Sequence, residues 1–180
     1  MIHDRIPIPG SGEAYLETYI LSPSDQIQIG WRHPVVIVCP GGAYLRTSDQ
    51  EAEQVALRFN TLGYHAAVLR YSVAPNRYPL SALELAWSIQ YCREHAAQWH
   101  VKPDAISVCG FSAGGHLAGT LGTCWMDPIF GKALDSRISW RPDSQILCYP
   151  VLTMGKYTHE GSRTGLLGSP EEPDNRLDVL

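Results

Sequence analysis

The chain has 180 residues, of which 44% are hydrophobic and 18% charged, and its formal net charge is −4. These values are typical of a single folded domain spanning residues 1–180 and exclude a disordered chain. Lysine and arginine form no block that would favour a nucleic acid or an anionic membrane as a partner. Because no apolar run has the length of a signal-peptide core or a membrane span, we expect a cytoplasmic protein.

The cysteines predict free thiols in a reducing compartment. They are odd in number and scattered, and none belongs to a Cys-x-x-Cys pair. They are Cys39, Cys92, Cys109, Cys124 and Cys148. His95 and His100 are five residues apart, so a helix would carry them on different faces, unlike a helical metal site. We therefore expect no metal and no cofactor.

Hydrophobic patterning predicts strands and helices that alternate along the chain. Residues 13–21 alternate loosely, which indicates an early strand at a sheet edge. Residues 34–39 form a continuous β-branched run, which is typical of a strand covered on both faces. The other predicted elements are a helix over 48–62, a strand over 65–71, a helix from 81 to about 99, a strand over 105–109, a helix from about 114 to about 123 and a strand over 145–151.

Ser-x-x-Glu capping boxes indicate where the first two helices begin, with Ser48 and Glu51 in one and Ser81 and Glu84 in the other. Strands that alternate with helices are joined by crossover connections and run parallel. The order therefore predicts an α/β fold with a mostly parallel sheet and helices on both faces. After Val151 the pattern ends, with no further strand signal.

A Gly-x-Ser-x-Gly motif at residues 110–114 lies between a predicted buried strand and a predicted helix. The motif alone is weak, but a nucleophile elbow requires this context. Gly110 and Gly114 would let the two backbones approach closely, while Ser112 at the apex would adopt a strained conformation that exposes its hydroxyl. The alternative is a glycine-rich nucleotide-binding turn with an incidental serine. No Gly-x-Gly-x-x-Gly or P-loop pattern supports that alternative.

Backbone N–H groups for an oxyanion hole are predicted at two places. The Ala113 N–H begins the helix after Ser112, where the positive end of the helix dipole adds to its effect. Gly41, Gly42 and Ala43 follow the earlier buried strand and provide small residues for a loop beside the nucleophile. A plain turn is the alternative for the two glycines, and their combination with the Ser112 turn favours an oxyanion loop.

At these residues the sequence resembles the α/β-hydrolase esterases, in particular bacterial enzymes related to hormone-sensitive lipase and acetyl-xylan esterase. Residues 40–43 (Pro-Gly-Gly-Ala) occupy the position of that family's His-Gly-Gly-Gly oxyanion loop. Residues 69–75, with Tyr78-Pro79, are similar to its Asp-Tyr-Arg-Leu-Ala-Pro stretch, and residues 110–118 to its nucleophile elbow. The resemblance covers about residues 30–155 and implies an α/β-hydrolase fold and a serine esterase.

The resemblance also implies a triad in the chain order Ser, Asp, His, with the acid and the histidine after later strands. Neither follows the last predicted strand here, so we expect a chain truncated at its C-terminus and a fold that lacks its last strands and helices. The histidines after Ser112 are His116, which we expect at the surface or in packing, and His159, the other candidate base. The candidate acid partners are Asp127, Asp135 and Asp143.

Two functions remain open on this basis. One is hydrolysis of small-molecule esters with short acyl groups, acetylated carbohydrates among them, through an acyl-enzyme on Ser112. The other is a catalytically inactive hydrolase-fold protein or fragment that binds a ligand or partner through the same cleft. A sheet that lacks strands has an unpaired edge, so we also expect aggregation or pairing of copies, which leaves a homo-oligomer open.

Overall fold

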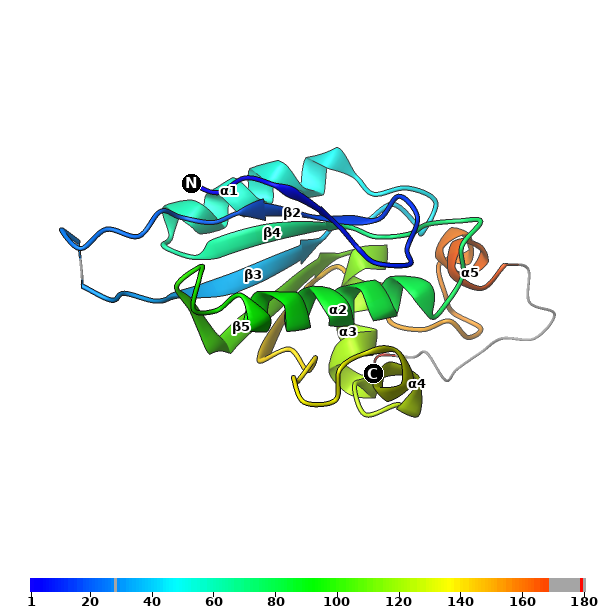
Figure 1. Cartoon of the computed structure of the whole chain (residues 1–180). Coiled ribbons are helices and arrows are strands. Elements are labelled where there is room, and N and C mark those ends of the chain that lie inside the picture. Colours follow the sequence, from blue (N-terminus) through cyan, green and yellow to red (C-terminus); the bar gives the residue numbers. More distant parts are fainter. Residues whose placement is uncertain (28, 169–178, 180) are drawn as a thin grey trace.

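A mixed β-sheet with helices on both faces forms the centre of the molecule (Figure 1). The computed structural model describes residues 1–27, 29–168 and 179. The described elements are β1 (Arg5–Pro7), β2 (Tyr15–Tyr19), β3 (His33–Cys39), the 3₁₀ helix η1 (Asp49–Glu51), α1 (Glu53–Thr61), β4 (His65–Arg70), α2 (Leu80–Glu94), β5 (Val101–Phe111), α3 (Ala113–Cys124), α4 (Pro128–Ala133), β6 (Ser144–Cys148) and α5 (Glu160–Leu167).

The strands of the described part lie in the order β1-β2-β4-β3-β5-β6. The four strands β4, β3, β5 and β6 run parallel, whereas β2 is antiparallel to β4 and β1 is antiparallel to β2. The parallel strands therefore end at one common edge of the sheet. That edge carries the turn at Ser112, because β5 ends at Phe111. The predicted mostly parallel sheet with helices on both faces is confirmed.

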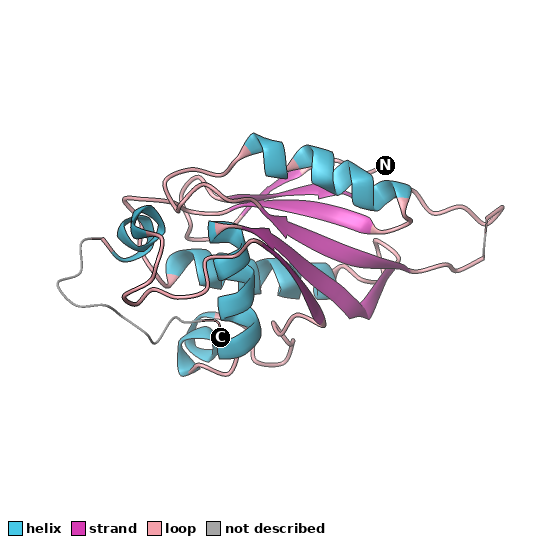
Figure 2. Cartoon of the chain, turned by 180° about the vertical axis from the view of Figure 1, so that it is seen from behind, coloured by secondary structure: helices cyan, strands magenta, loops and turns pink. Residues whose placement is uncertain are grey.

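The residues of β3 alternate between the two layers of the core. Val35 and Ile37 pack in the cluster that includes residues of α2 and α3, whereas Val36 and Val38 pack with Ala56 of α1. Figure 2 shows the molecule from the side of α1. These four side chains of β3 are fully buried, which explains why polar and apolar residues do not alternate in this part of the strand.

The strand predicted over residues 13–21 forms as β2, but it is not at the sheet edge. β1 pairs with its outer side, with Arg5 opposite Glu17. The predicted edge position of this strand is therefore wrong. β1 could not be predicted because it has three residues, too few to show an alternation of polar and apolar side chains. At the opposite edge, β6 exposes Ile146 and Leu147.

Neither predicted capping box forms. Ser48 makes no side-chain cap to the η1 helix, and α2 begins at Leu80 after Pro79 as its N-cap. The acidic members have other partners: Glu84 is 1% exposed and accepts a hydrogen bond from the Ser72 N–H at 2.7 Å. Glu51 likewise turns away from the helix, toward the site described below.

Helix boundaries differ from the predicted ones near the end of α2, which stops at Glu94 instead of continuing to about Trp99. The chain reverses there to begin β5, and the Val101 N–H donates to the Ala96 carbonyl at 2.9 Å. The short helices α4 and α5 have no counterpart in the sequence prediction. All five cysteines are free. Among the described residues, no helix has both the length and the apolar character that crossing a bilayer requires.

Candidate active site

Ser112 occupies the sharp turn between β5 and α3. Its backbone has φ 51° and ψ −114°, a conformation that side-chain-bearing residues rarely adopt. The Ser112 N–H donates to the Cys148 carbonyl at 3.0 Å, and the Ser112 carbonyl accepts from the N–H groups of His116 at 3.0 Å and Val151 at 3.1 Å. The turn is therefore held from both sides, by its own helix and by the chain that follows β6.

Glycine is required at both ends of this turn. A Cβ atom added to Gly110 would overlap the Gly114 carbonyl oxygen, and one added to Gly114 would overlap the Cys39 carbonyl oxygen. The first turn of α3 thus lies directly against the end of β3 as well as against β5. This contact brings the segment after β3 beside Ser112, as the sequence predicts.

Gly41 of that segment approaches the serine side chain closely. A Cβ atom built on Gly41 would lie 3.1 Å from the Ser112 Cβ and 2.9 Å from the Phe111 carbonyl oxygen. Gly42 and Ala43 follow with φ values of 132° and 57°. The loop therefore passes the nucleophile turn at van der Waals distance in an irregular backbone conformation.

The N–H groups of this region divide into two sets. The Gly41 N–H donates to Glu51 Oε2 at 2.7 Å, so it is not free to bind an oxyanion. For the N–H groups of Gly42, Ala43 and Ala113, the described residues provide no hydrogen-bond acceptor. The Ala113 N–H also begins α3, where the helix dipole favours negative charge.

Glu51 bridges two sides of the site. Its Oε2 holds the Gly41 N–H, and its Oε1 accepts the Tyr149 hydroxyl at 2.7 Å. That hydrogen bond raises the pKa of Tyr149 to about 12, so the phenol remains protonated at neutral pH. Sequence reasoning assigned Glu51 to a capping box and missed this role, because the contact with Tyr149 joins residues 98 positions apart.

A buried hydrogen bond lies behind the loop. The Tyr44 hydroxyl and His116 Nδ1 are 2.8 Å apart, and both side chains are 1% exposed. Burial raises the pKa of Tyr44 well above its ordinary value. Of the two roles expected for His116, packing is therefore the one observed.

An open cavity of about 460 Å³ lies next to the serine. Its walls come from the chain after β6. The lining residues are Ser112, Tyr149, Pro150, Val151, Leu152, Thr153, Tyr157, Thr158 and His159. Within the described residues, the Ser112 hydroxyl has no hydrogen-bond partner, so it is available to a ligand in this cavity.

His159 shares the cavity with Ser112 but is committed elsewhere. It is the N-cap residue of α5, and its Nδ1 accepts the Ser162 N–H at 3.2 Å. An Nδ1 that accepts a hydrogen bond is unprotonated, which leaves the hydrogen of the neutral ring on Nε2. In this arrangement Nε2 cannot take the proton of the Ser112 hydroxyl.

The three candidate acids are also engaged locally. Asp127 caps α4 by accepting the Ile129 N–H. Asp135 binds Arg137, whose guanidinium lowers the pKa of that carboxyl to about 2. Asp143 accepts the Ile106 N–H at 2.8 Å and pairs with Arg93. Among the described residues, none of these acids is hydrogen-bonded to His159. In the part of the chain that the structure describes, no three or more His, Cys, Asp or Glu side chains are grouped so that they could hold a metal ion.

Comparison with known proteins gives one family match, described as BD-FAE, over residues 23–145. An endo-1,4-beta-xylanase B from Butyrivibrio fibrisolvens is 34% identical over 140 residues, which cover 74% of this chain and 22% of that protein. An acetylxylan esterase from Xylanibacter ruminicola is 28% identical over 144 residues, which cover 79% of this chain and 28% of that protein. The chain spans about a quarter of the length of these two relatives.

Among solved structures, the chain is similar to an acetyl ester-xyloside bifunctional hydrolase from Caldicellulosiruptor lactoaceticus. The TM-score is 0.80 and the sequence identity 34%, and the match covers 97% of this chain and 66% of that chain. Likeness at this level extends well beyond the Gly-x-Ser-x-Gly motif, since it includes the sheet and the segments on both sides of the Ser112 turn.

Proposed function

The chain belongs to the BD-FAE family and has the α/β-hydrolase fold of esterases, and we propose that it hydrolyses short-chain carboxylic esters through an acyl-enzyme on Ser112. The observation that carries the proposal is the strained Ser112 turn. It exposes a hydroxyl without a partner among the described residues, beside the unoccupied N–H groups of Gly42 and Ala113.

In the proposed reaction, the Ser112 oxygen attacks the ester carbonyl carbon while its proton passes to a general base. The carbonyl oxygen becomes negatively charged and accepts hydrogen bonds from the Ala113 N–H and from Gly42, with Ala43 as a further donor. The C–O bond to the alcohol then breaks, and the alcohol leaves with a proton. Water subsequently releases the acid and restores the hydroxyl. The base is a group outside the described contacts of Ser112.

Acetylated carbohydrates are the substrate class that we propose for this site. The support comes from the relatives, one an acetylxylan esterase and another an acetyl ester-xyloside hydrolase. The cavity beside Ser112 is open, so a bulky alcohol portion of the ester can extend from it. We expect acetylated xylo-oligosaccharides and p-nitrophenyl acetate to be hydrolysed faster than p-nitrophenyl octanoate.

A fluorophosphonate probe tests the nucleophile directly. We expect the protein expressed from its coding sequence, with any segment that follows Leu180, to be labelled on the peptide containing Ser112. Ser112→Ala should abolish labelling and ester hydrolysis together, because it removes the attacking oxygen. Ser136→Ala, at an exposed serine remote from the turn, is the control and should label as the wild type does. Absence of labelling on Ser112 would rule the acyl-enzyme out.

A second candidate function is ligand binding without catalysis. One observation favours it: His159 is committed to the α5 cap, and no imidazole among the described residues is hydrogen-bonded to Ser112. A serine without a base is a poor nucleophile at neutral pH. A protein that binds acetylated xylo-oligosaccharides unchanged and resists the probe would support this candidate over the esterase.

A further inference from the structure

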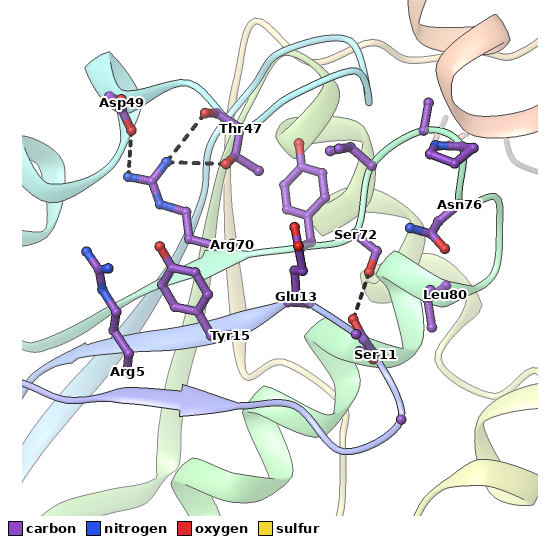
Figure 3. A pocket seen from close by; sticks show the side chains of 17 residues that line it. Arg5, Ser11, Glu13, Tyr15, Thr47, Asp49, Arg70, Ser72, Asn76 and Leu80 are labelled. Atoms are coloured by element: carbon purple, nitrogen blue, oxygen red, sulfur yellow. Dashed lines mark hydrogen bonds and ion pairs between the residues drawn. The ribbon is translucent and has the colours of Figure 1, made fainter.

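A second cavity of the described structure does not have Ser112 among its lining residues. Its volume is about 680 Å³, within the range of roughly 300–1,000 Å³ that is common for small-molecule sites. Figure 3 shows it between the residues that precede β2, the end of β4 and the segment that leads into η1. Because Tyr15 of β2 lies opposite Arg70 at the end of β4, the cavity opens at the same edge of the sheet as Ser112.

Arg70 forms a fixed polar wall of this cavity. Its guanidinium pairs with Asp49 at 2.8 Å and donates to the Thr47 hydroxyl at 3.3 Å (Figure 3). Its Nε is buried and has no hydrogen-bond partner among the described residues. The arginine is thus held in place by two neighbours while part of its donor capacity is unused.

Ser72 forms a second fixed point. Both its N–H and its hydroxyl bind the carboxylate of Glu84, which is 1% exposed. The hydrogen bond that the hydroxyl donates to this buried carboxylate restricts the rotation of the serine side chain. Ser72 therefore offers its oxygen to the cavity in one orientation, and Asn76 and Glu13 add exposed polar groups around it.

The charges of the lining cancel. Arg5 and Arg70 contribute two positive charges, and Glu13 and Asp49 contribute two negative ones. A phosphate or carboxylate ligand would meet both carboxylates, and a cation would meet both guanidinium groups. The chemistry that fits is a neutral ligand with many hydroxyl groups, since each wall offers hydrogen bonds and Tyr15 adds an aromatic ring.

The cavity and the serine site share one segment of chain, residues 40–51. The Tyr71 hydroxyl, at the cavity, donates to the Pro40 carbonyl at 2.6 Å. The Arg70–Asp49 pair ties the other end of the same segment to β4. Gly41, which contacts the Ser112 turn, lies between these two anchors, and Glu51, which binds Tyr149, follows two residues after the second.

We propose that this cavity binds neutral sugar units of the glycan that carries the ester. The inference rests on the proposed function for the choice of glycan, whereas the binding itself requires no reaction at Ser112. A glycan held there would be presented to the serine along the common edge of the sheet, with the 40–51 segment as the wall between them.

Unacetylated xylotriose is the probe, because it has no ester to hydrolyse. We expect saturable binding by calorimetry, and chemical-shift changes at the amides of residues 11–15 and 71–76. Glu13→Gln and Asn76→Ala alter exposed side chains that line the cavity. Each should weaken binding by roughly three- to tenfold, the effect of one lost hydrogen bond. The matched control Glu94→Gln, exposed on α2, makes the same charge change and should bind as the wild type does.

Three results would overturn the proposal: no saturable binding at millimolar xylotriose, shifts confined to residues 149–159, or equal weakening by Glu94→Gln. Inorganic phosphate is tested alongside, and binding of phosphate in place of xylotriose would show an anion site instead. Fluorophosphonate labelling of Ser112 is measured on the same samples. Xylotriose binding without labelling of Ser112 would refute the esterase and support the sugar site. Labelling of Ser112 without xylotriose binding would support the esterase and refute the sugar site.

Discussion

The Tyr44 hydroxyl and His116 Nδ1 share a hydrogen bond of 2.8 Å that joins the loop after β3 to the helix after β5. Both groups are buried, and the helix residue lies four positions after the candidate nucleophile. The two parts of the proposed oxyanion site, the loop and the first turn of α3, are therefore connected through the core as well as through the backbone contact at Gly114.

Tyr44→Phe should destabilise the fold by about 1–3 kcal/mol, because it leaves a polar atom of buried His116 with one hydrogen bond fewer. Urea unfolding monitored by circular dichroism measures the change. Tyr157→Phe is the matched control, since Tyr157 is 84% exposed and should change stability by less than about 0.5 kcal/mol. Equal effects of the two substitutions would contradict a structural role for the buried pair.

Glu51→Ala should slow ester hydrolysis and probe labelling by at least about tenfold while the fold persists, because Gly41 and Tyr149 both lose their acceptor. Glu51→Gln should recover most of this loss. Its carbonyl can accept the Gly41 N–H, and its amide can donate to the tyrosine oxygen. Glu53→Ala, at an exposed carboxylate two residues later, serves as the control. If Glu51 acts by positioning the loop, Glu51→Gln should keep both the rate and the pH–rate profile close to those of the wild type. If its negative charge is what matters, Glu51→Gln should be as slow as Glu51→Ala.

Gly114→Ala should cost about 3 kcal/mol or abolish soluble expression, because the added methyl group would overlap the Cys39 carbonyl oxygen and neither backbone can move freely. Gly131→Ala in α4 places its methyl 3.9 Å from Trp140 and should be neutral or stabilising by up to about 1 kcal/mol. Melting temperatures of the two variants test the difference. A soluble, stable Gly114→Ala protein would show that the strand and helix are not in the described contact.

His65 should make the fold sensitive to acid. Burial is the main cause that lowers the pKa of His65 from 6.5 to about 4, and the neighbouring His33 adds to the effect. Its Nδ1 accepts the Leu21 N–H at 3.1 Å, which requires the neutral ring. A group whose folded-state pKa is lowered favours unfolding when it protonates. Stability is thus complete above pH 6.5 and is lost between pH 6.5 and 4, by on the order of 2–3 kcal/mol. Urea midpoints across this range should fall less steeply for His65→Gln, which cannot titrate.

The fold was largely predictable because its central strands β3 and β4 are buried on both faces. The continuous β-branched run of β3 and the Gly-x-Ser-x-Gly turn at Ser112 follow from local sequence, so both could be placed from the sequence alone. β1 could not, because its pairing with β2 depends on tertiary contact and not on its own three residues.

The candidate site was predictable in its backbone and not in its side-chain partners. Gly110 and Gly114 are required by close backbone contacts at the turn, and together with Ser112 they form a motif that is visible in the sequence. Glu51 has the sequence pattern of a helix cap, and only the approach of Gly41 and Tyr149 from distant parts of the chain decides where its carboxylate points. Short-range spacing carries no information about such contacts.

The backbone conformation of Ser112 lowers the stability of the fold, and a glycine at this position would relieve the strain. A non-glycine residue with φ 51° costs on the order of 1–3 kcal/mol, and glycine adopts that conformation without the same penalty. Ser112→Gly should therefore be more stable than Ser112→Ala by about 1 kcal/mol, although both lack the hydroxyl. Chemical denaturation of the two variants measures this difference. A higher stability of Ser112→Gly would show that serine at this position costs stability, which is evidence for a functional role obtained without a substrate.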